Sequence, residues 1–472
     1  MKKLLCILLI ALGTASMQAQ TYSVLHNFGG VGGSQPQRNL TLLGSHLYGM
    51  TTNGGDSNYG CIFTIDTNGN GFRVIHNFSP LGGNGPGWPA GSLTLSGSTL
   101  YGTTTVGGTS GNGAIFSIDT NGSSFTVLHE FNGFFDGADP RESLTLLGNT
   151  LFGVTELGGK DGSGIIFSIS TNGLGYKILL NFNDTDGGAP IGDLVAQGKH
   201  LYGVASAGGT GFPFNSAGCI YRIDTNGAND TVLYSLTAMD GSIPWGTPIL
   251  SGNTLYGTTE EGGTGSFGTV FSVNTNGTGF TVLANGDAIH GGQFVGDLLL
   301  SGNNLLGLAP TGGNGSTIYS VTTNGSSFNT VVDFTGTVGA YMGKSPYGGL
   351  ISSGNTFYGM TQNGGTQDSG VLFKLSGATL GINDIQTNNS AQVNVYPNPN
   401  NGNFTVNFHS LQSGKYAIEV YNIIGEQVLK TSLDNTQNNS INMGAQPSGV
   451  YLYRVIAENG NLIGQGKLVI QK

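Results

Sequence analysis

The sequence predicts an all-β protein, a seven-bladed β-propeller that is closed by its amino-terminal strand and followed by a small β-sandwich domain. The first observation behind this prediction is composition, because 84 of the 472 residues are glycine and 37% are hydrophobic, while only 9% are charged. Such a chain has apolar surface to bury and many tight turns to make. The second observation is internal repetition with a period of about 50 residues, which is typical of propellers and solenoids.

The repeat is marked by an apolar residue, an aromatic residue in most copies, and a glycine. This landmark recurs at intervals of 50 to 54 residues. Its seven glycines are Gly49, Gly102, Gly153, Gly203, Gly257, Gly307 and Gly359. The even spacing predicts seven equivalent structural units.

Each unit contains four strand signals separated by turn signals. In the second unit a short strand at 93–97 precedes the landmark strand, and a Gly-Gly pair follows it at 107–108. An alternating strand at 115–119 then leads through Asn121-Gly122 into a fourth strand at 125–131. Asn-Gly between two alternating segments is a strong signal for a type I′ hairpin. Four short antiparallel strands per unit are what one propeller blade requires.

The two ends of the repeat region complement each other. The seventh unit has its third strand at 371–375, but no fourth strand follows. Residues 22–28 match the fourth-strand pattern and precede the first unit. We expect this amino-terminal strand to complete the last blade, which removes an open sheet edge. A linear β-solenoid is the alternative, but it would have no use for such a permutation.

This pattern, over about residues 21 to 378, resembles the bacterial tandem repeats known as GloVer repeats, which occur in exported proteins. It is more distantly similar to the kelch repeat, in which Gly-Gly follows a strand with a similar aromatic residue. The sequence lacks the regular outer-strand Trp of kelch repeats. The kelch resemblance therefore implies propeller geometry and no particular partner.

A different composition begins at about Thr387. Alternating strands separated by turns predict a small β-sandwich of about 80 residues. The motifs that carry the pattern are, in order, 393–399, 402–404, 414–426, 448–455 and 466–472. Together they resemble the type A sorting domain of the type IX secretion system. The resemblance implies a bacterium of the Bacteroidota type, passage through the periplasm, and the type IX secretion machinery as a partner of residues 392–472. An ordinary adhesive module at the chain end is the alternative.

The amino terminus has the pattern of a secretory signal peptide. Lys2 and Lys3 precede an apolar run at 4–12, and small or polar residues follow through Ala19. The run is too short to span a bilayer, and no other segment approaches that length. We therefore expect a signal peptide at 1–19, a propeller at 20–378, a linker at 379–391 and a sorting domain at 392–472. The expected location is secreted or on the outer cell surface.

Charge and cysteine content restrict the possible partners. The formal net charge is −10, and no run of Lys or Arg could neutralise several phosphates, so nucleic acid is not an expected partner. Apart from Cys6 in the signal peptide, the cysteines are Cys61 and Cys219, which occupy the same repeat position in units one and four. Because those positions lie on distant blades, we expect two buried free thiols.

Candidate catalytic and metal-binding residues are few. His26, His76 and His129 share one place in the fourth strand, where other copies have Leu, Tyr, Ala or Val, so we expect a packing position. Asp66 begins a segment that resembles the opening of a calcium loop, but the twelfth position is Asn77 and the segment coincides with a hairpin turn. We expect no metal site, cofactor or identifiable catalytic residue. Asp-Gly turns, not catalytic acids, are expected at Asp136, Asp186 and Asp240.

The loops between blades carry the candidate binding residues. Each loop ends with a proline in six copies and with Phe294 in the seventh, and these loops should share one face with the Gly-Gly loops, opposite the Asn-Gly hairpins. Exposed aromatic side chains on a rigid scaffold can stack on sugar rings or anchor a protein. The alternative is that they cover the ends of neighbouring blades. The six candidates are Trp88, Phe134, Phe135, Trp245, Phe294 and Tyr347.

Three functional hypotheses follow. The first is a non-enzymatic binding module for extracellular glycan or protein. The second is an extracellular polysaccharide hydrolase or lyase built on a propeller, and the third is a structural component of the cell surface. A convergent cluster of Asp, Glu, Arg or His at one end of the central channel would favour the enzyme. Equivalent, near-symmetric polar residues there would argue against catalysis.

Overall fold

The computed structural model describes residues 21–79, 85–183, 185–210, 217–313, 315–376, 392–398, 400–409, 416–422, 427–433, 439–457 and 462–472. The chain divides into two compact units, Met1–Gly381 and Ile382–Lys472. The expected signal peptide and the expected linker lie outside the described residues. Within the described part, no helix is long and apolar enough to cross a membrane.

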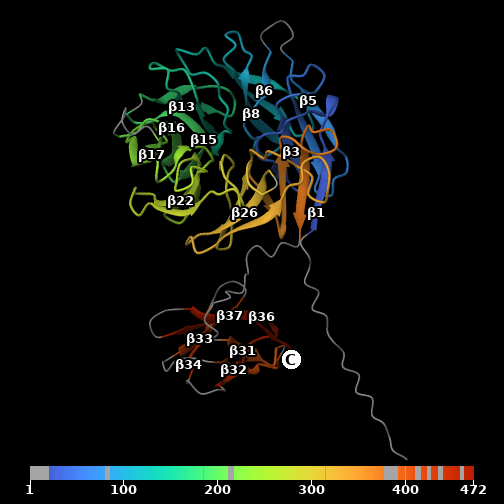
Figure 1. Ribbon diagram of the computed structural model, residues 1–472, viewed down its shortest axis with the longest axis vertical. Coiled ribbons are helices and arrows are strands. Elements are labelled where there is room, and N and C mark those ends of the chain that lie inside the picture. The colour runs from blue at the N-terminus through green and yellow to red at the C-terminus, as the bar shows by residue number, and fades with distance from the viewer. Residues whose placement is uncertain are drawn as a thin grey trace, which may run out of the picture. The chain divides into compact units, whose positions relative to one another are not determined.

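The first unit is an all-β, propeller-like assembly of antiparallel sheets. Its described residues form seven sheets of four or five strands, in which strands adjacent in sequence pair with each other. Figure 1 shows the sheets following one another around a common centre. A single 3-10 turn, η1 (Gly30–Gly32), is the helical element described in this unit.

Every sheet repeats the same four roles. The first strands are β2 (Thr41–Leu43), β7 (Thr94–Ser96), β11 (Thr145–Leu147), β15 (Gly188–Gln197), β20 (Ile249–Ser251), β24 (Leu299–Ser301) and β28 (Ile351–Ser353). The second strands, which carry the landmark glycine, are β3 (His46–Thr51), β8 (Thr99–Val106), β12 (Thr150–Thr155), β16 (His200–Ala207), β21 (Thr254–Glu261), β25 (Asn304–Ala309) and β29 (Thr356–Thr361). Two short strands, β6 (Gly87–Pro89) and β19 (Ser242–Pro244), extend the pairing of β8 and β21.

The remaining two roles complete each sheet. The third strands are β4 (Cys61–Asp66), β9 (Ala114–Asp119), β13 (Ile165–Ser170), β17 (Cys219–Asp224), β22 (Thr269–Asn274), β26 (Thr317–Thr322) and β30 (Val371–Ser376). The fourth strands are β5 (Arg73–Asn77), β10 (Thr126–Glu130), β14 (Lys177–Asn181), β18 (Thr231–Ser235), β23 (Thr281–Asn285), β27 (Phe328–Asp333) and, from the amino terminus, β1 (Thr21–Asn27). β1 pairs with β30 from Thr21 opposite Ser376 to Asn27 opposite Val371.

The landmark glycine is required by a close approach between neighbouring strands. A Cβ atom at Gly153 would lie 2.5 Å from Cζ of Phe167, and one at Gly102 would lie 2.5 Å from Cζ of Phe116. Both phenylalanine rings are fully buried. The aromatic ring of the third strand therefore covers the glycine of the second strand, and only a residue without a side chain leaves room for it.

Hydrophobic cores lie between successive sheets. One core joins Tyr48 and Ile62 of the first repeat to Leu100 and Phe116 of the second. Equivalent cores join the later sheets. Another core places Phe63 of the first repeat against residues of the seventh, including Tyr358 and Leu372. Each sheet thus buries both of its faces against neighbours.

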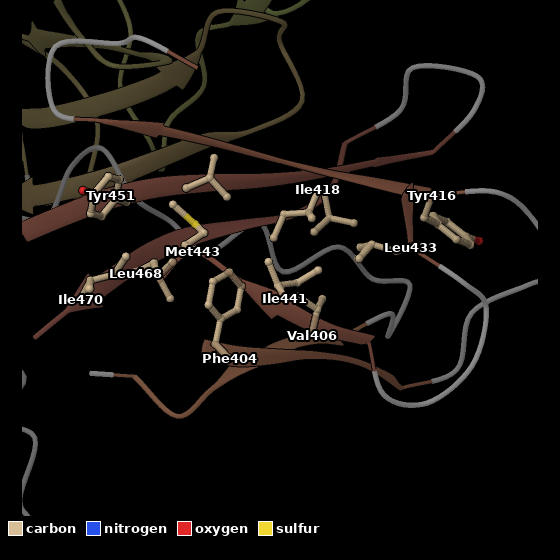
Figure 2. Close-up of a cluster of buried hydrophobic side chains, with 12 residues drawn as sticks. Phe404, Val406, Tyr416, Ile418, Leu433, Ile441, Met443, Tyr451, Leu468 and Ile470 are labelled. Carbon is tan, nitrogen blue, oxygen red and sulfur yellow. The ribbon is translucent and has the colours of Figure 1, made fainter. Parts of the chain in front are cut away.

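The second unit packs two small sheets around one core. One sheet has the order β31 (Gln392–Tyr396), β32 (Asn403–His409), β35 (Asn439–Asn442). The other has the order β34 (Gln427–Leu433), β33 (Tyr416–Asn422), β36 (Gly449–Ala457), β37 (Leu462–Ile470). Figure 2 shows Phe404, Val406 and Ile441 of the first sheet facing Ile418 and Leu468 of the second. This arrangement is that of a β-sandwich.

Candidate functional site

The loops that enter each first strand share an unusual backbone. The residue before the loop proline has a positive φ between 47° and 58° in every copy, including Trp88 and Ile243. Such a φ is costly for a residue with a side chain. The strain is offset locally, because the backbone N–H of this residue bonds the preceding repeat, as from Trp88 to the carbonyl of Tyr59 at 3.0 Å. These long loops are therefore held in a fixed conformation.

A ring of hydrogen bonds runs around the centre of the assembly. Its members lie three residues after the loop proline position, and we call them the polar ring: Asn39, Ser92, Ser143, Asp193, Thr247, Asp297 and Gly349. The backbone N–H of one member donates to the side-chain oxygen of the next. The donor–acceptor distances are 2.9 Å from Asn39 to Ser92, 2.7 Å from Ser92 to Ser143, 2.6 Å from Ser143 to Asp193, 2.9 Å from Asp193 to Thr247 and 2.7 Å from Thr247 to Asp297.

Gly349 has no side chain to continue this pattern. The backbone N–H of Gly349 donates to Oδ1 of Asn39, but Gly349 offers no side-chain oxygen to Asp297. Asn39 and Asp297 are instead joined directly, because Nδ2 of Asn39 donates to Oδ2 of Asp297 at 2.6 Å. Six members thereby form a closed circuit of hydrogen bonds, and Gly349 is attached to it through Asn39. Because the same position serves the same purpose in most copies, the polar ring is architectural.

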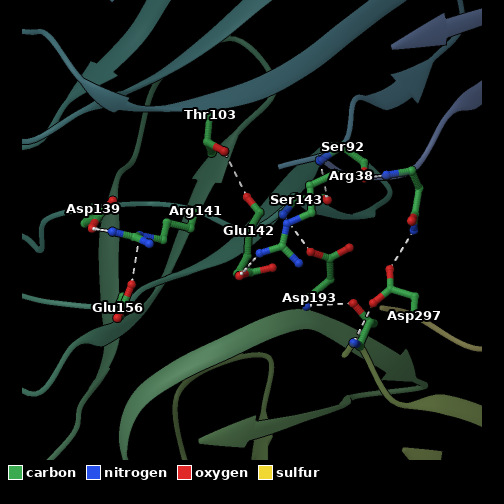
Figure 3. A network of polar contacts seen from close by, with 12 residues as sticks. Arg38, Ser92, Thr103, Asp139, Arg141, Glu142, Ser143, Glu156, Asp193 and Asp297 are labelled. Carbon is green, nitrogen blue, oxygen red and sulfur yellow. Dashed lines mark hydrogen bonds and ion pairs between the residues drawn. The ribbon is translucent and has the colours of Figure 1, made fainter. Parts of the chain in front are cut away.

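A charged cluster breaks the symmetry of this centre. The residue two places after the loop proline position is glycine in five copies, but Arg38 and Glu142 occupy it in the first and third. Figure 3 shows the two side chains facing each other, with Asp193 and Asp297 nearby. Nη2 of Arg38 lies 2.6 Å from Oε1 of Glu142, and only 14% and 3% of the two side chains are exposed.

The cluster holds three carboxylates against one guanidinium. Burial, with the charges of Asp297 and Glu142, raises the pKa of Asp193 to about 7. Burial also raises the pKa of Glu142, although Arg38 opposes the shift. Burial alone would lower the pKa of Arg38, but the three carboxylates outweigh it and the pKa is raised. The single guanidinium of Arg38 therefore does not offset the cost of burying Asp193 and Glu142 in charged form.

A second ion-pair group lies beside the cluster on the third repeat. Nη2 of Arg141 lies 2.8 Å from Oδ2 of Asp139, and its Nε lies 2.9 Å from Oε2 of Glu156. The Arg141 side chain is about half exposed. Figure 3 shows this group next to Glu142. Arg141 therefore presents part of its charge to solvent, while its two partners are mostly covered.

The tips of the long loops expose apolar side chains. Three loops are closed by reciprocal backbone hydrogen bonds, between Gly133 and Gly137, Asp287 and Gly291, and Gly336 and Gly343. Their tips, and the equivalent positions of two other loops, carry aliphatic or aromatic residues with at least 64% of their surface exposed. We call them the apolar tips: Val31, Phe134, Phe135, Met239, Ile289 and Val338.

The predicted aromatic binding residues differ in their exposure to solvent. Phe134 and Phe135 are exposed and meet edge to face, with ring centres 5.3 Å apart. Trp88 and Tyr347 are partly exposed, and the Trp88 ring stacks on Tyr59 with ring centres 5.8 Å apart. Trp245 is half-buried. Among the described ring contacts, Phe134 with Phe135 is the pair that joins two of these candidates.

Phe294 requires a correction, because it cannot contact a ligand. It is fully buried, and its ring centre lies 4.7 Å from that of Tyr319 within a core between two sheets. In this copy the residue that replaces the loop proline turns its side chain inward. Sequence reasoning also missed the aliphatic tips, whose common position three or four residues after the end of the fourth-strand segment was the available signal.

The other residues considered from sequence have structural roles. His26, His76 and His129 stack on Phe72, Phe125 and Tyr176 of the following repeat at 3.6 to 3.9 Å, which confirms the predicted packing position. Cys61 and Cys219 are free and buried, as predicted.

The acidic turn residues also behave as expected from the sequence. The carboxylates of Asp136, Asp186 and Asp240 accept backbone N–H groups of their own loops, and that of Asp66 accepts those of Asn68 and Asn70, so these residues form turns. Within the described part of the chain, no group of three His, Cys, Asp or Glu residues could hold a metal ion.

Comparisons with known proteins match both units of the chain. The family described as the Gloeobacter/Verrucomicrobia repeat matches residues 13–214 and 210–410. The family described as the secretion system C-terminal sorting domain matches residues 394–471. No curated protein matches the chain.

Several solved structures match this chain at a low level of similarity. An oligogalacturonate lyase in complex with manganese has a TM-score of 0.49 at 10% identity, over 76% of this chain and 90% of that one. A protein of unknown function from Bacteroides thetaiotaomicron has a TM-score of 0.41 at 10% identity, over 67% and 81%. The extracellular domain of a hybrid two-component system from B. thetaiotaomicron has a TM-score of 0.46 at 11% identity, over 96% and 58%. Likenesses at this level indicate no activity.

Proposed function

We propose that this chain, which belongs to the Gloeobacter/Verrucomicrobia repeat family, is a non-enzymatic binding protein that recognises an extracellular ligand through its long-loop face. Its sorting domain directs it through type IX secretion to the cell surface or outside. The long-loop face comprises the loops between sheets and the Gly-Gly loops. The opposite side, with the Asn-Gly turns, is the hairpin face.

The scaffold of this proposal is a closed seven-bladed propeller. Three observations support closure over a linear solenoid: β1 pairs with β30, the polar ring links the first and last repeats through Asn39 and Gly349, and a hydrophobic core joins the same two repeats. Closure leaves only short sheet edges at the periphery and makes the long-loop face rigid. A rigid face holds its loop side chains in fixed relative positions.

The apolar tips carry the binding proposal. Phe134, Phe135 and Met239 are 64%, 74% and 65% exposed, on loops whose backbone is fixed by hydrogen bonds. Large apolar side chains held in water on rigid loops are typical of interaction surfaces. Burial of such a side chain on a partner contributes about 1.5 to 3 kcal/mol.

A binding measurement with the full mature chain tests this function. We would screen an array of glycans and a panel of purified extracellular proteins, and then compare Phe134→Ser/Phe135→Ser with Leu174→Ser. Leu174 is 68% exposed on the hairpin face, so it is a matched control. We expect at least a tenfold loss of affinity from the tip variant and none from the control. Equal losses, or the absence of any bound ligand, would contradict the proposal.

An extracellular polysaccharide hydrolase or lyase is a second candidate, favoured by one observation. The charged cluster is asymmetric, and the pKa of Asp193 is raised to about 7, as in catalytic acids. Against it, Glu142 is almost fully buried in an ion pair, and Asp193 and Asp297 accept hydrogen bonds of the polar ring. New reducing ends or unsaturated products from neutral or acidic polysaccharides, lost in Asp193→Asn, would favour the enzyme.

A further inference from the structure

Charge is segregated between the two faces of the repeat unit. Between residues 21 and 376, the described acidic residues near the hairpins are Asp66, Asp119, Asp224 and Asp230, and the other sixteen lie in or beside the long loops and Gly-Gly loops. Basic residues divide almost evenly, with four on the long-loop side and five on the hairpin side. The long-loop face therefore has a large negative excess, while the hairpin face is almost neutral.

In three of the long loops an acidic residue stands beside an apolar tip. Asp136 directly follows Phe135, Asp240 directly follows Met239, and Asp287 precedes Ile289 by two residues. Each of these carboxylates accepts a backbone N–H of its own loop, from Asn132, Thr237 and Ile289 respectively. The hydrogen bonds hold each negative charge close to an apolar tip. This pairing recurs in loops of three different repeats.

The two described ends of the repeat unit, Thr21 and Ser376, lie on the opposite face. β30 runs from the long-loop side to the hairpin side and ends at Ser376, which lies opposite Thr21 of β1. Neither of these two described ends therefore lies on the long-loop face.

We propose that the long-loop face binds a positively charged protein surface. Lysine and arginine side chains of the partner would lay their aliphatic stems on the apolar tips and place their charged ends against the neighbouring carboxylates. This inference rests on the binding function proposed above and names the partner. Opposite charge also accelerates encounter over a distance of about 8 Å, the screening length at physiological salt.

The charge distribution of the long-loop face disfavours other classes of partner. Nucleic acids and anionic polysaccharides are repelled by the negative excess of this face. Neutral glycans would gain from stacking on Phe134 and Phe135 but nothing from the carboxylates. A basic protein surface is the partner class that would contact both the apolar tips and the neighbouring carboxylates.

Titration with two synthetic peptides tests the inference. One peptide alternates lysine and leucine, and the other alternates glutamate and leucine, so that they differ only in charge. The test variant is Glu260→Gln/Glu261→Gln, at the end of β21 next to the Gly262-Gly263 pair on the long-loop face. The control is Asp119→Asn/Asp230→Asn on the hairpin face, which makes the same change in charge. Binding of the full mature chain would be measured by fluorescence anisotropy at low and physiological salt.

We expect the lysine peptide to bind and the glutamate peptide not to bind. Affinity for the lysine peptide should fall about 3- to 10-fold in Glu260→Gln/Glu261→Gln, the range for two exposed ion pairs, and should be unchanged in the control. Affinity should also fall in Phe134→Ser/Phe135→Ser but not in Leu174→Ser. Equal effects of the two charge variants would overturn the inference, because they would indicate non-specific attraction.

The outcomes separate this inference from the function on which it rests. If a neutral glycan binds, and its affinity falls in Phe134→Ser/Phe135→Ser but not in the charge variants, the binding function stands and the basic partner is wrong. If Phe134→Ser/Phe135→Ser changes the affinity for neither peptide nor glycan, the binding function itself fails.

Discussion

The hairpin face and the long-loop face are formed by opposite ends of the same strands. The repeats are nearly alike on the hairpin face and differ strongly from one another on the long-loop face. On the hairpin face, the glycine of each Asn-Gly turn donates its N–H across the turn in the same way, as from Gly122 to Asp119 and from Gly227 to Asp224, both at 2.8 Å. On the long-loop face, the equivalent tips are as different as Val31, Phe134 and Met239. The comparison indicates that one end of the strands is scaffold and the other has been individually adapted.

The two faces also differ in how their charges are held. On the hairpin face, Lys199 and Asp224 form an ion pair at 2.9 Å, but the lysine side chain is 67% exposed. On the long-loop side, Arg38 and Glu142 are both buried. Because water screens the first pair and not the second, equal substitutions should have very unequal effects.

The largest expected effect is on the charged cluster. Arg38→Met leaves Glu142 buried without its partner beside Asp193 and Asp297, and should lower the free energy of unfolding by about 3 to 5 kcal/mol. Glu142→Gln should cost less, because Arg38 retains the two aspartates. The double variant Arg38→Met/Glu142→Leu should recover much of the loss, and Lys199→Met on the hairpin face should cost at most about 1 kcal/mol. Denaturant unfolding measures all four, and equal costs for Arg38→Met and Lys199→Met would refute the contrast.

The next effect is a dependence of stability on pH at the same centre. The pKa of Asp193 is raised to about 7 in the folded protein from an ordinary value of 3.8. The contribution of Asp193 to stability is complete at a pH below its ordinary pKa and is lost as pH rises through its pKa in the folded protein. Asp193 should therefore make the protein more stable at pH 5 than at pH 8 by about 2 to 3 kcal/mol.

Asp193→Asn should remove this dependence while still accepting the N–H of Ser143. The histidine stacks at the outer edge act in the opposite direction, because burial lowers the pKa of His76 to about 4 and costs stability as pH falls below the ordinary value of 6.5. The two contributions are separated by comparing His76→Phe with Asp193→Asn in unfolding experiments from pH 5 to pH 8. An unchanged slope in Asp193→Asn would contradict the assignment.

A smaller effect on stability is expected when glycines are replaced, and it should differ between the strands and the hairpin turns that join them. In the third repeat, Gly153→Ala would place a Cβ atom 2.5 Å from Phe167, and overpacking of this kind costs about 1 to 3 kcal/mol. Gly148→Ala meets no atom within 4 Å, so its cost is limited to a positive φ of 58°. Phe167→Leu should relieve part of the Gly153→Ala cost in the double variant. Thermal unfolding measures the difference, and equal costs would remove the packing explanation of the landmark.

Repetition explains how much of the fold could be predicted. The landmark glycines, the Asn-Gly turns and the alternating third strands are local patterns, and seven copies reinforce one another. The predicted histidine packing position was found for the same reason, since equivalent positions could be compared. The displaced fourth strand at 22–28 could also be recognised, because its pattern was known from the other copies.

The charged cluster could not be predicted because it depends on which loops meet at the centre. Arg38 and Glu142 are 104 positions apart, and the sequence does not show that their side chains face each other. The available signal was that both replace a glycine conserved in the other five copies of the same chain. Phe294 was misplaced for a related reason, because the direction of a loop side chain depends on its neighbours in space.

The smallest expected effect on stability belongs to the apolar tips, and it is the sharpest test of the division between scaffold and adapted face. Phe134 and Phe135 contact each other but leave most of their surface in water, so Phe134→Ser/Phe135→Ser should change the free energy of unfolding by no more than about 0.5 kcal/mol. Leu174→Ser on the hairpin face should be equally neutral. Differential scanning calorimetry of both variants gives the measurement. A substantial loss of stability in Phe134→Ser/Phe135→Ser alone would mean that the tips pack on the scaffold, and their exposure would then no longer argue for a partner.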